Sequence, residues 1–453
     1  MNRVSVVLRG LLLGTLCSTA AIAASAQSEA QQFPVATKTL KNGMKVLVAS
    51  DHSIPNVALY IFYKIGSRNE HPGTTGLSHF FEHMMFNGAK KYGPGDLDKA
   101  MEANGASNNA YTTENVTVYQ DWFPRSALNL IFDIEADRIQ YLSFDAKKIA
   151  SEREVVASER RTSVDANNGG LLDEQLKATA FIAHPYQWPV IGWMSDIEHW
   201  TIDDLKHHFE MGYAPNNATM VVVGDVIPEE IFQLCEKYIE PIPQHAPPPP
   251  VTTVEPEQMG ERRLIVRKPA QLPLLMIGYH VPQTNSRDFY ALNVLRTVLV
   301  QGESSRMYQR LVDKDQIALE VNISQQAGFD PTLAVVAAQP KPGVDPQKCE
   351  AAIYDELEKV KKTPISDQEL EKAKNIRLVE FYHQMRTING RANTIGTYEV
   401  FFGDYNKLFD AAKNYGAVTK GDVQRVAQKY FGANNRTVAT LIPENGEPGG
   451  AKQ

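Results

Sequence analysis

The stretch GLSHFFEHMMFNG, residues 76–88, decides how the rest of the chain is understood. Its apolar residues lie on almost every side of a helical projection, and a helix that is apolar nearly all round is a buried one. Thr74 or Thr75 can cap the start of this helix, and Gly88 is a typical residue at a helix end. The pattern therefore predicts one buried helix over residues 76–88.

Three polar residues share one face of this helix. His79, Glu82 and His83 stand at positions i, i+3 and i+4, which lie above one another. Unpaired charge is too costly to bury. The two imidazoles and the carboxylate must therefore be paired with other groups or bind a metal.

The spacing H-x-x-E-H suits zinc. Two histidines one helical turn apart can each place a ring nitrogen ~2.0–2.1 Å from one Zn²⁺. Glu82 lies between His79 and His83 and can take a proton from a water that zinc acidifies toward a pKa of ~7. The order is the inverse of the H-E-x-x-H motif of metallopeptidases. Because so short a motif also occurs by chance, the alternative is two core or surface histidines with an unrelated acid.

A catalytic zinc needs a third protein ligand and an open position. Residues 151–161, SEREVVASERR, offer the best candidates. Glu152 and Glu159 are seven residues apart and share a helix face with Val155 and Val156, whereas Glu154 faces elsewhere. This places a carboxylate pair beside an apolar stripe. The alternative is a solvated helix laced with salt bridges, as its arginines suggest.

Composition limits the class of protein. The 453 residues are 43% hydrophobic and 22% charged, which predicts a globular chain of two or more domains. The formal net charge of −7 comes without basic clusters and argues against nucleic acid or an anionic membrane as the main partner. After the N-terminal segment, no stretch is long and apolar enough to predict a transmembrane anchor.

Residues 1–26 form a predicted signal peptide. Arg3 and Arg9 give a positive start, residues 10–24 are apolar, and Ala24-Ser25-Ala26 is an A-x-A cleavage site. This predicts cleavage after Ala26 and a periplasmic or secreted protein. A mitochondrial presequence is the alternative, which the continuous apolar segment fits less well.

The cysteines exclude a disulfide scaffold. Cys17 would leave with the signal peptide, and only Cys235 and Cys349 remain, in different halves of the chain. One bridge between them and two separate thiols are both compatible with the sequence.

A proline-rich segment divides the mature chain. Residues 241–250, PIPQHAPPPP, begin a predicted extended linker over 241–261. We expect an N-terminal domain over residues 34–240, a C-terminal domain over 262–443, and a disordered tail over 444–453.

The two domains look like a repeat. Thr201, Asp204, Asn216, Asn217 and Thr219 recur as Thr419, Asp422, Asn434, Asn435 and Thr437, always 218 residues later. Both halves open with strands (45–49, 57–63; 263–267, 274–279), continue with helices (127–141, 145–161; 346–361, 366–385) and close with an apolar strand (219–223; 437–442). This order predicts an α+β fold of two homologous domains, each a mainly antiparallel sheet with helices packed on one face.

Several motifs together resemble a known family. They are GSRNE (66–70), GLSHFFEHMMF (76–86), NAYT (109–112), Glu152 with Glu159, HPY (184–186), VIG (190–192) and YAPNN (213–217). The chain resembles the pitrilysin/insulinase family of zinc peptidases, in the short two-domain branch that includes the mitochondrial processing peptidase and bacterial homologues. The likeness covers nearly the whole mature chain.

The resemblance implies roles for the site residues. The family's third zinc ligand lies 76 residues after the second histidine, which is Glu159 here, so His79, His83 and Glu159 are expected to bind one Zn²⁺ per chain. Glu82 is expected to be the general base. Glu152 is expected to orient the site from outside the ligand shell. Together these residues predict a zinc metalloendopeptidase.

Residues 109–112 resemble the family's active-site edge strand. Asn109, Ala110 and Tyr111 are therefore expected to bind substrate, since an exposed edge can add a peptide as an extra strand. The expected substrate is a peptide or unfolded segment in extended form. The alternative is an ordinary strand end.

The second half departs from the family pattern. It has no H-x-x-E-H, and the Arg and Tyr that many members carry seven residues apart are replaced by Val312 and Leu319. Losing such a donor at an oxyanion site typically costs ~10²–10³ in rate. We therefore expect a heterodimer in which a homologous subunit supplies the Arg/Tyr pair. The alternative is a non-catalytic structural or peptide-binding subunit with a vestigial zinc site.

Overall fold

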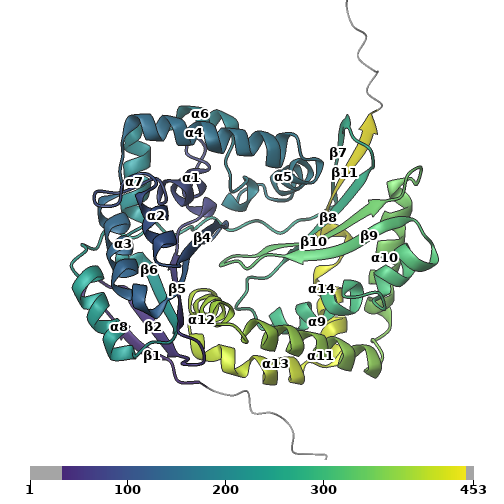
Figure 1. Ribbon diagram of the computed structural model, residues 1–453. Coiled ribbons are helices and arrows are strands. Elements are labelled where there is room, and N and C mark those ends of the chain that lie inside the picture. The colour runs from purple at the N-terminus through teal and green to yellow at the C-terminus, as the bar shows by residue number, and fades with distance from the viewer. Residues whose placement is uncertain (1–32, 445–453) are drawn as a thin grey trace, which may run out of the picture. The chain divides into compact units, whose positions relative to one another are not determined.

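The structure is a computed structural model that describes residues 33–444 (Figure 1). The expected signal peptide, residues 1–26, lies outside the described residues, as do residues 445–453 of the expected tail. Glu444, the first residue of that expected tail, is instead the last residue of a strand. The described residues from Pro34 onward belong to one compact unit.

The first sheet has two central strands that are covered on both faces. Its strands are β1 (Ala36–Thr39), β2 (Lys45–Ser50), β3 (Asn56–Tyr63), β4 (Ser107–Thr112), β5 (Thr117–Pro124) and β6 (Ala218–Gly224). Strands β3 and β6 are runs of β-branched, aromatic and other apolar residues, almost all of them buried. Such runs are typical of strands with both faces covered.

The strand order of this sheet is β1-β2-β6-β3-β5-β4. The β2–β6 pair is parallel, and the other pairs are antiparallel. β4 pairs only with β5 and is therefore an edge strand. The sheet is mixed, as the prediction of a mainly antiparallel sheet allows.

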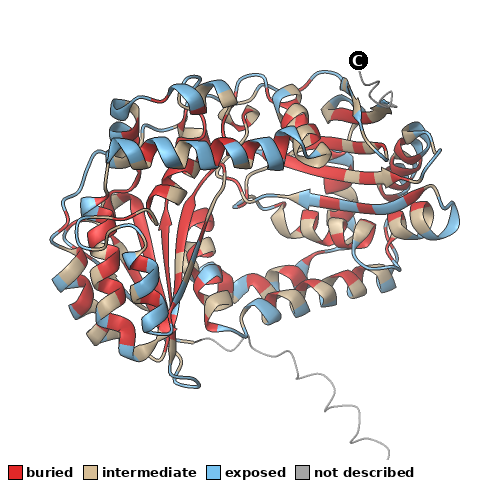
Figure 2. Cartoon of the chain, turned by 45° about the horizontal axis from the view of Figure 1, so that its top comes forward, coloured by how far each residue is buried: buried red, intermediate tan, exposed pale blue. Residues whose placement is uncertain are grey.

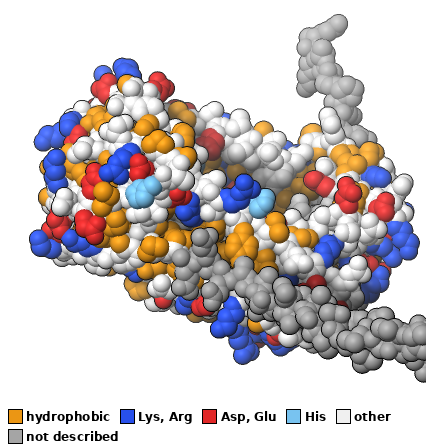
Figure 3. Space-filling view, turned by 60° about the horizontal axis from the view of Figure 1, so that its bottom comes forward, with side chains coloured by type: hydrophobic (Ala, Val, Ile, Leu, Met, Phe, Trp, Pro, Cys, Tyr) orange, Lys and Arg blue, Asp and Glu red, His pale blue; other side chains and the backbone are white. Residues whose placement is uncertain are grey.

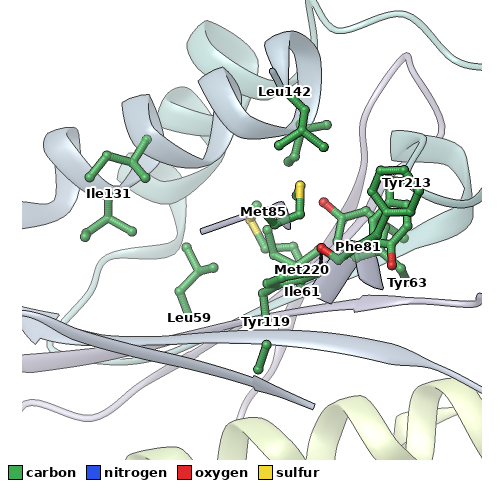
Figure 4. Close-up of a cluster of buried hydrophobic side chains, with 14 of the residues drawn as sticks. Leu59, Ile61, Tyr63, Phe81, Met85, Tyr119, Ile131, Leu142, Tyr213 and Met220 are labelled. Carbon is green, nitrogen blue, oxygen red and sulfur yellow. Dashed lines mark hydrogen bonds between the residues drawn. The ribbon is translucent and has the colours of Figure 1, made fainter. Parts of the chain in front are cut away.

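One face of the first sheet is covered by helices. The helices of this half are α1 (Leu77–Met84), α2 (Asp96–Ala103), α3 (Leu128–Tyr141), α4 (Ala146–Arg160), α5 (Asn168–Ala180), α6 (Met194–His199), α7 (Ile202–Gly212) and α8 (Pro228–Leu234). Figure 4 shows Phe81 of α1 beside Ile61 of β3, Tyr119 of β5 and Met220 of β6, with Ile131 of α3 on the side of Leu59. Helix α1 therefore lies in the core of this half.

The second half repeats this framework. Its strands are β7 (Arg262–Pro269), β8 (Leu274–Val281), β9 (Ala318–Gln325), β10 (Thr332–Pro340) and β11 (Arg436–Glu444). Their order is β7-β11-β8-β10-β9, again with one parallel pair, β7–β11. Its helices are α9 (Phe289–Val300), α10 (Pro346–Lys362), α11 (Asp367–Gln384), α12 (Ile388–Phe402), α13 (Ala411–Ala417) and α14 (Lys420–Tyr430).

Short helical turns complete the described chain. The 3₁₀ turns are Ser67–Asn69, Arg125–Ala127, Pro185–Gln187, Pro215–Asn217, Tyr405–Asp410 and Ala433–Asn435. The π-helical segments are Arg161–Asp165, Cys235–Ile239 and Tyr308–Lys314.

The repeated residues have a structural role in both halves. Thr201 caps α7 in a reciprocal capping box with Asp204, and Thr419 caps α14 with Asp422 in the same way. The prediction of an α+β chain with two similar halves is therefore confirmed. Residues 243–260 between the halves contain no helix or strand.

The two halves also exchange one helix each, which the sequence did not reveal. Helix α5 of the first half packs on β7, β8 and β11 of the second sheet, and α12 of the second half packs on β3 and β6 of the first (Figure 1). Gly396 of α12 leaves no room for a side chain, because an added Cβ would stand 2.0 Å from a ring carbon of Phe62. These helices cover the second face of each sheet, and Figure 2 shows the buried residues along the strands.

The structure shows how charges are distributed on one face and whether the two cysteines are bridged. Figure 3 shows Lys and Arg side chains interspersed with Asp and Glu side chains on the face it presents. Cys235 and Cys349 are both buried and both free, so they are separate thiols. Among residues 33–444, no helix combines the length and apolar character needed to cross a bilayer.

Candidate metal centre

The start of α1 is held by a buried carboxylate. The helix begins after Gly76, whose φ of 91° lies in the left-handed region, and no threonine caps it. Glu70 accepts hydrogen bonds from the backbone N–H groups of Gly76 and Ser78, both at 2.7 Å. The prediction of a Thr74 or Thr75 cap is wrong, because the Thr75 hydroxyl donates to Asp196 instead. Burial, opposed by these two bonds, raises the pKa of Glu70 to about 7.

The structure brings His79, His83 and Glu159 together. Oε2 of Glu159 lies 3.7 Å from Nε2 of His79 and 3.3 Å from Nε2 of His83. One donor atom from each residue lies within 4.8 Å of the other two. Ligands of a tetrahedral zinc, each ~2.0–2.1 Å from the ion, stand about 3.4 Å apart, so the three side chains fit this metal.

Among the described residues, no other group of His, Cys, Asp and Glu side chains meets the same criterion for a metal site. The Glu159 side chain is 42% exposed, whereas that of His79 is 13% exposed. The cluster is therefore open to solvent on the Glu159 side. A catalytic zinc site needs such an open side for water or substrate.

Burial and pairing set the charges of these groups. Burial, together with the neighbouring His83, lowers the pKa of His79 to about 4. Burial also acts to lower the pKa of His83, but hydrogen bonds to Glu152 and Glu159 outweigh it and raise the pKa to about 9. A hydrogen bond from His83 is the main cause that holds the pKa of Glu159 below its usual range. A metal at these atoms would compete with the proton on His83.

Glu152 contacts His83 on the side away from the cluster. Nδ1 of His83 donates to Oε1 of Glu152 at 2.8 Å, which leaves Nε2 facing Glu159. The side-chain amide of Asn87 donates to the other Glu152 oxygen at 2.5 Å. The hydrogen bond from His83 is the main cause that lowers the pKa of Glu152. A carboxylate in this place fixes the ring orientation and tautomer of a metal-binding histidine.

Glu82 faces the end of the edge strand. The hydroxyl of Thr112, the last residue of β4, donates to Oε2 of Glu82 at 2.6 Å. Burial raises the pKa of Glu82, which makes its carboxylate a stronger proton acceptor. Asn109, Ala110 and Tyr111 lie on the same strand, and the Tyr111 hydroxyl donates to Asn393 of α12 at 3.2 Å.

The two positions that depart from the family pattern carry no polar side chain. Val312 lies in the π-helical segment and packs against the core of the second half, and Leu319 lies in β9 with 46% of its surface exposed. The nearby arginines are already paired, Arg306 with Glu369 and Arg310 with Asp315.

Three residues of the site could not be identified as site residues from the sequence. Thr112 was known only as part of the edge-strand motif, Asn87 only as part of the helix, and Glu70 only as part of the GSRNE motif. Asn87 stands four residues after His83, so its position on the same helical face was a usable signal. No local signal links Glu70 or Thr112 to α1.

A two-nitrogen, one-oxygen donor set with an open side, next to a partly buried carboxylate, is typical of a metallohydrolase. Comparison with known proteins identifies the family within this class. The insulinase family model (peptidase family M16) matches residues 45–192, and the peptidase M16 inactive domain model matches residues 199–377. Zinc protease PqqE of Helicobacter pylori is 32% identical over 410 residues, which is 89% of this chain and 92% of that protein.

The chain therefore belongs to the M16 family and is a zinc protease. The zinc protease YmxG of Bacillus subtilis is 23% identical over 90% of this chain and 98% of that protein. The crystal structure of a protease from Helicobacter pylori matches with a TM-score of 0.88 and 31% identity, over 91% of this chain and 100% of that chain. A peptidase M16 inactive domain from Pseudomonas fluorescens shares the fold, with a TM-score of 0.84 at 16% identity over 92% of this chain and 100% of that chain.

Proposed function

We propose that this zinc protease is an endopeptidase that cleaves extended peptides beside β4, with Glu82 as the general base. The observation that carries the proposal is the hydrogen bond from Thr112 to Glu82. It joins the end of the edge strand to the carboxylate next to the metal-binding cluster. A peptide added to this edge would run toward Glu82.

The residues divide the work of hydrolysis. His79, His83 and Glu159 would hold one zinc ion, and Glu152 would keep His83 in the orientation that presents Nε2. Zinc, when bound, supplies a Lewis acid that polarises the scissile carbonyl and acidifies water. Glu82 accepts a proton from the attacking water and returns it to the leaving amine.

The edge strand would hold the substrate through its main chain. β4 has a partner on one side only, so backbone groups on its outer side can pair with an added peptide. Asn109, Ala110 and Tyr111 would provide these groups. Binding of this kind selects extended or unfolded segments, because a folded substrate has no free backbone to offer.

Replacement of Glu82 tests the assigned base. Glu82→Gln should leave about one zinc per chain and reduce peptide cleavage at least ~10²-fold, since general-base catalysis contributes 10²–10⁴ in rate. Zinc content by atomic absorption and cleavage by mass spectrometry are measured on the same samples. Glu154→Gln, an exposed glutamate on α4, is the matched control. Unchanged cleavage by the Glu82→Gln protein would refute the role of Glu82.

We further propose that the active form is a heterodimer in which a homologous subunit supplies an Arg/Tyr pair. Support comes from Val312 and Leu319, which cannot donate a hydrogen bond to a developing oxyanion. The purified, zinc-loaded chain should then be at least ~10²-fold less active alone than with its partner. Full activity of the isolated chain would refute the proposed heterodimer.

The alternative function is a non-catalytic, peptide-binding subunit with a vestigial zinc site. The same two positions favour it, and it predicts that a partner complex loses no activity when Glu82 becomes Gln.

For localisation, we propose export with cleavage after Ala26. N-terminal sequencing of the protein from its native cells should begin at Gln27, and retention of residues 1–26 would argue against export.

A further inference from the structure

A cavity of about 320 Å³ in the second half is lined by polar and charged side chains from elements far apart in the sequence. Its polar wall includes Asn293 and Arg296 of α9, Gln326 just after β9, Arg377 and Glu380 of α11, and Asn393 of α12. None of these residues belongs to the metal centre.

The cavity is the counterpart of the metal centre in the repeated framework. Helix α9 follows β8 as α1 follows β3, and α11 is the second helix after β10 as α4 is the second helix after β5. Helix α9 packs on α11 as α1 packs on α4, and β9 is the edge strand of its sheet as β4 is of the first. The first half places metal ligands at this point. The second half places two arginines there.

The charges in the cavity do not balance. Nη2 of Arg377 pairs with Oε2 of Glu380 at 2.7 Å, and Gln301 donates to the other oxygen of Glu380. Within residues 33–444, no carboxylate forms an ion pair with Arg296, and buried Nε of Arg377 has no hydrogen-bond acceptor. Two guanidinium groups therefore share one carboxylate.

A surplus positive charge in a partly closed site favours an anionic ligand. Burial, and next the charge of Arg377, hold the pKa of Arg296 below its usual value, although arginine remains charged at neutral pH. Leaving a cation in such surroundings without a partner is costly. A planar carboxylate can accept paired hydrogen bonds from guanidinium groups and restore the balance.

The cavity also adjoins the strand that we expect to bind substrate. Asn393 forms part of its wall and accepts a hydrogen bond from the Tyr111 hydroxyl of β4 at 3.2 Å. Tyr111 faces the side of the first sheet on which α12 packs. In a peptide added to β4, every second side chain would point to that same side.

We propose that this cavity binds a carboxylate group of the peptide substrate through Arg296 and Arg377. The proposal rests on the proposed function, because it assumes that a peptide lies along β4. The carboxylate is either an acidic side chain or the C-terminus of the peptide. Both present the same group to the arginines, and the test separates them.

Binding can be measured without turnover in zinc-loaded Glu82→Gln protein. The probes are three fluorescent versions of one peptide that the wild-type protein cleaves: the parent with its acidic residues and free C-terminus, a version with Glu and Asp replaced by Gln and Asn, and a version with a C-terminal amide. Anisotropy titrations should show that one replacement weakens binding about 10- to 100-fold, the usual range for a charge-assisted hydrogen bond. The sensitive version identifies the source of the carboxylate.

Arg296→Met should weaken binding of the parent peptide by the same factor and abolish the difference among the three peptides. Arg296→Lys keeps the charge and should restore part of that difference. Arg287→Met, which removes an 85% exposed arginine from the same half, is the control and should behave like the parent protein. Circular dichroism checks that each variant is folded.

Equal binding of all three peptides to a folded Glu82→Gln protein would overturn the proposal. So would an unchanged preference in a folded Arg296→Met protein. These outcomes differ from failure of the proposed function, which would appear as cleavage of the parent peptide by Glu82→Gln protein.

Discussion

Helices α1 and α9 occupy equivalent places in the two halves, yet they carry different chemistry. Each follows the antiparallel central strand of its sheet, and each packs against the second helix after the next long strand of that sheet, α1 against α4 and α9 against α11. Helix α1 presents His79, Glu82 and His83, whereas α9 presents Asn293 and Arg296. The apolar pattern thus sets the framework, and a few polar residues on one helical face set what each half can bind.

The halves also differ in what supports these helices. His208 of α7 lies under α1 and its Nε2 is 3.0 Å from the Ser78 hydroxyl. The residue 218 positions later is Val426 of α14, which is fully buried. A polar residue therefore contacts the helix that carries the proposed metal ligands, and the second half fills the same place with an apolar side chain.

Loss of a metal ligand should have the largest effect. His83→Ala removes one of three donors, so the first half should become as free of metal as the second. We expect zinc to fall from about one per chain to none after dialysis, and cleavage to fall more than the ~100-fold upper figure for residues outside the ligand shell. His207→Ala removes an exposed histidine of α7 and should change neither quantity. Stoichiometric zinc in the dialysed His83→Ala protein would contradict the assigned ligand set.

Loss of the carboxylate behind His83 should have a smaller effect. Glu152→Gln keeps an acceptor near Nδ1 of His83 but removes the negative charge. We expect zinc affinity to fall about 10- to 100-fold, as it does when such supporting partners are replaced. Competition titration with a chromogenic chelator measures it, with Glu154→Gln as the control. Equal affinities for the two variants would show that Glu152 does not support the site.

The exchanged helices allow a direct comparison of packing. At Gly396 of α12 an added Cβ would stand 2.0 Å from fully buried Phe62, whereas at Gly278 of β8, which α5 covers, it would meet Leu333 at 3.4 Å. Gly396→Ala should lower the free energy of unfolding by about 1–3 kcal/mol, the usual cost of overpacking. Gly278→Ala meets only ordinary contacts and should instead raise it by about 0.4–1 kcal/mol, because the unfolded chain loses conformational freedom. Urea unfolding tests both, and equal midpoints would show that α12 can move away from the first sheet.

The smallest effect should be a change in how steeply the free energy of unfolding depends on pH. Burial, and next the charges of His207 and His71, lower the pKa of His208 to about 3. Above pH ~6.5 the histidine is neutral in both states. Below pH ~6.5 the histidine binds a proton in the unfolded chain but not in the folded chain. The free energy of unfolding therefore falls as pH falls toward 3.

His208→Val places at this position the residue that the second half has as Val426. It should reduce the fall in the free energy of unfolding by up to ~1.4 kcal/mol per pH unit. Urea midpoints between pH 4.5 and 7.5 measure the slope. His383→Val, which removes an exposed histidine of α11, should leave it unchanged. A His208→Val protein with the wild-type slope would mean that His208 is not held neutral.

Much of the framework could be predicted from the sequence because its signals are local. The strands around residues 57–63 and 219–223 and the helices around 127–141 and 366–385 were placed within one or two residues. The recurrence of Thr201 as Thr419 marked the repeat, because a capping box needs the same residues wherever it forms. His79, Glu82 and His83 were found because one helical turn brings them together.

What the sequence could not predict depends on contacts between distant segments. Glu159 was one of two candidate carboxylates on an Arg-rich helix until the family spacing singled it out. Glu70 caps α1 from six residues upstream, and Thr112 reaches Glu82 from another strand. The exchange of α5 and α12 between the sheets leaves no periodic signal either. The predicted domain boundaries and the roles of the site residues stay predictions.

The same framework forms both halves of the chain, and we infer that it holds a metal in the first half only. Anomalous diffraction at the zinc edge from crystals of the zinc-loaded protein tests this claim most directly. We predict one strong peak per chain, between His79, His83 and Glu159, and none in the cavity beside Arg296. A peak elsewhere, or a second peak in the second half, would contradict it.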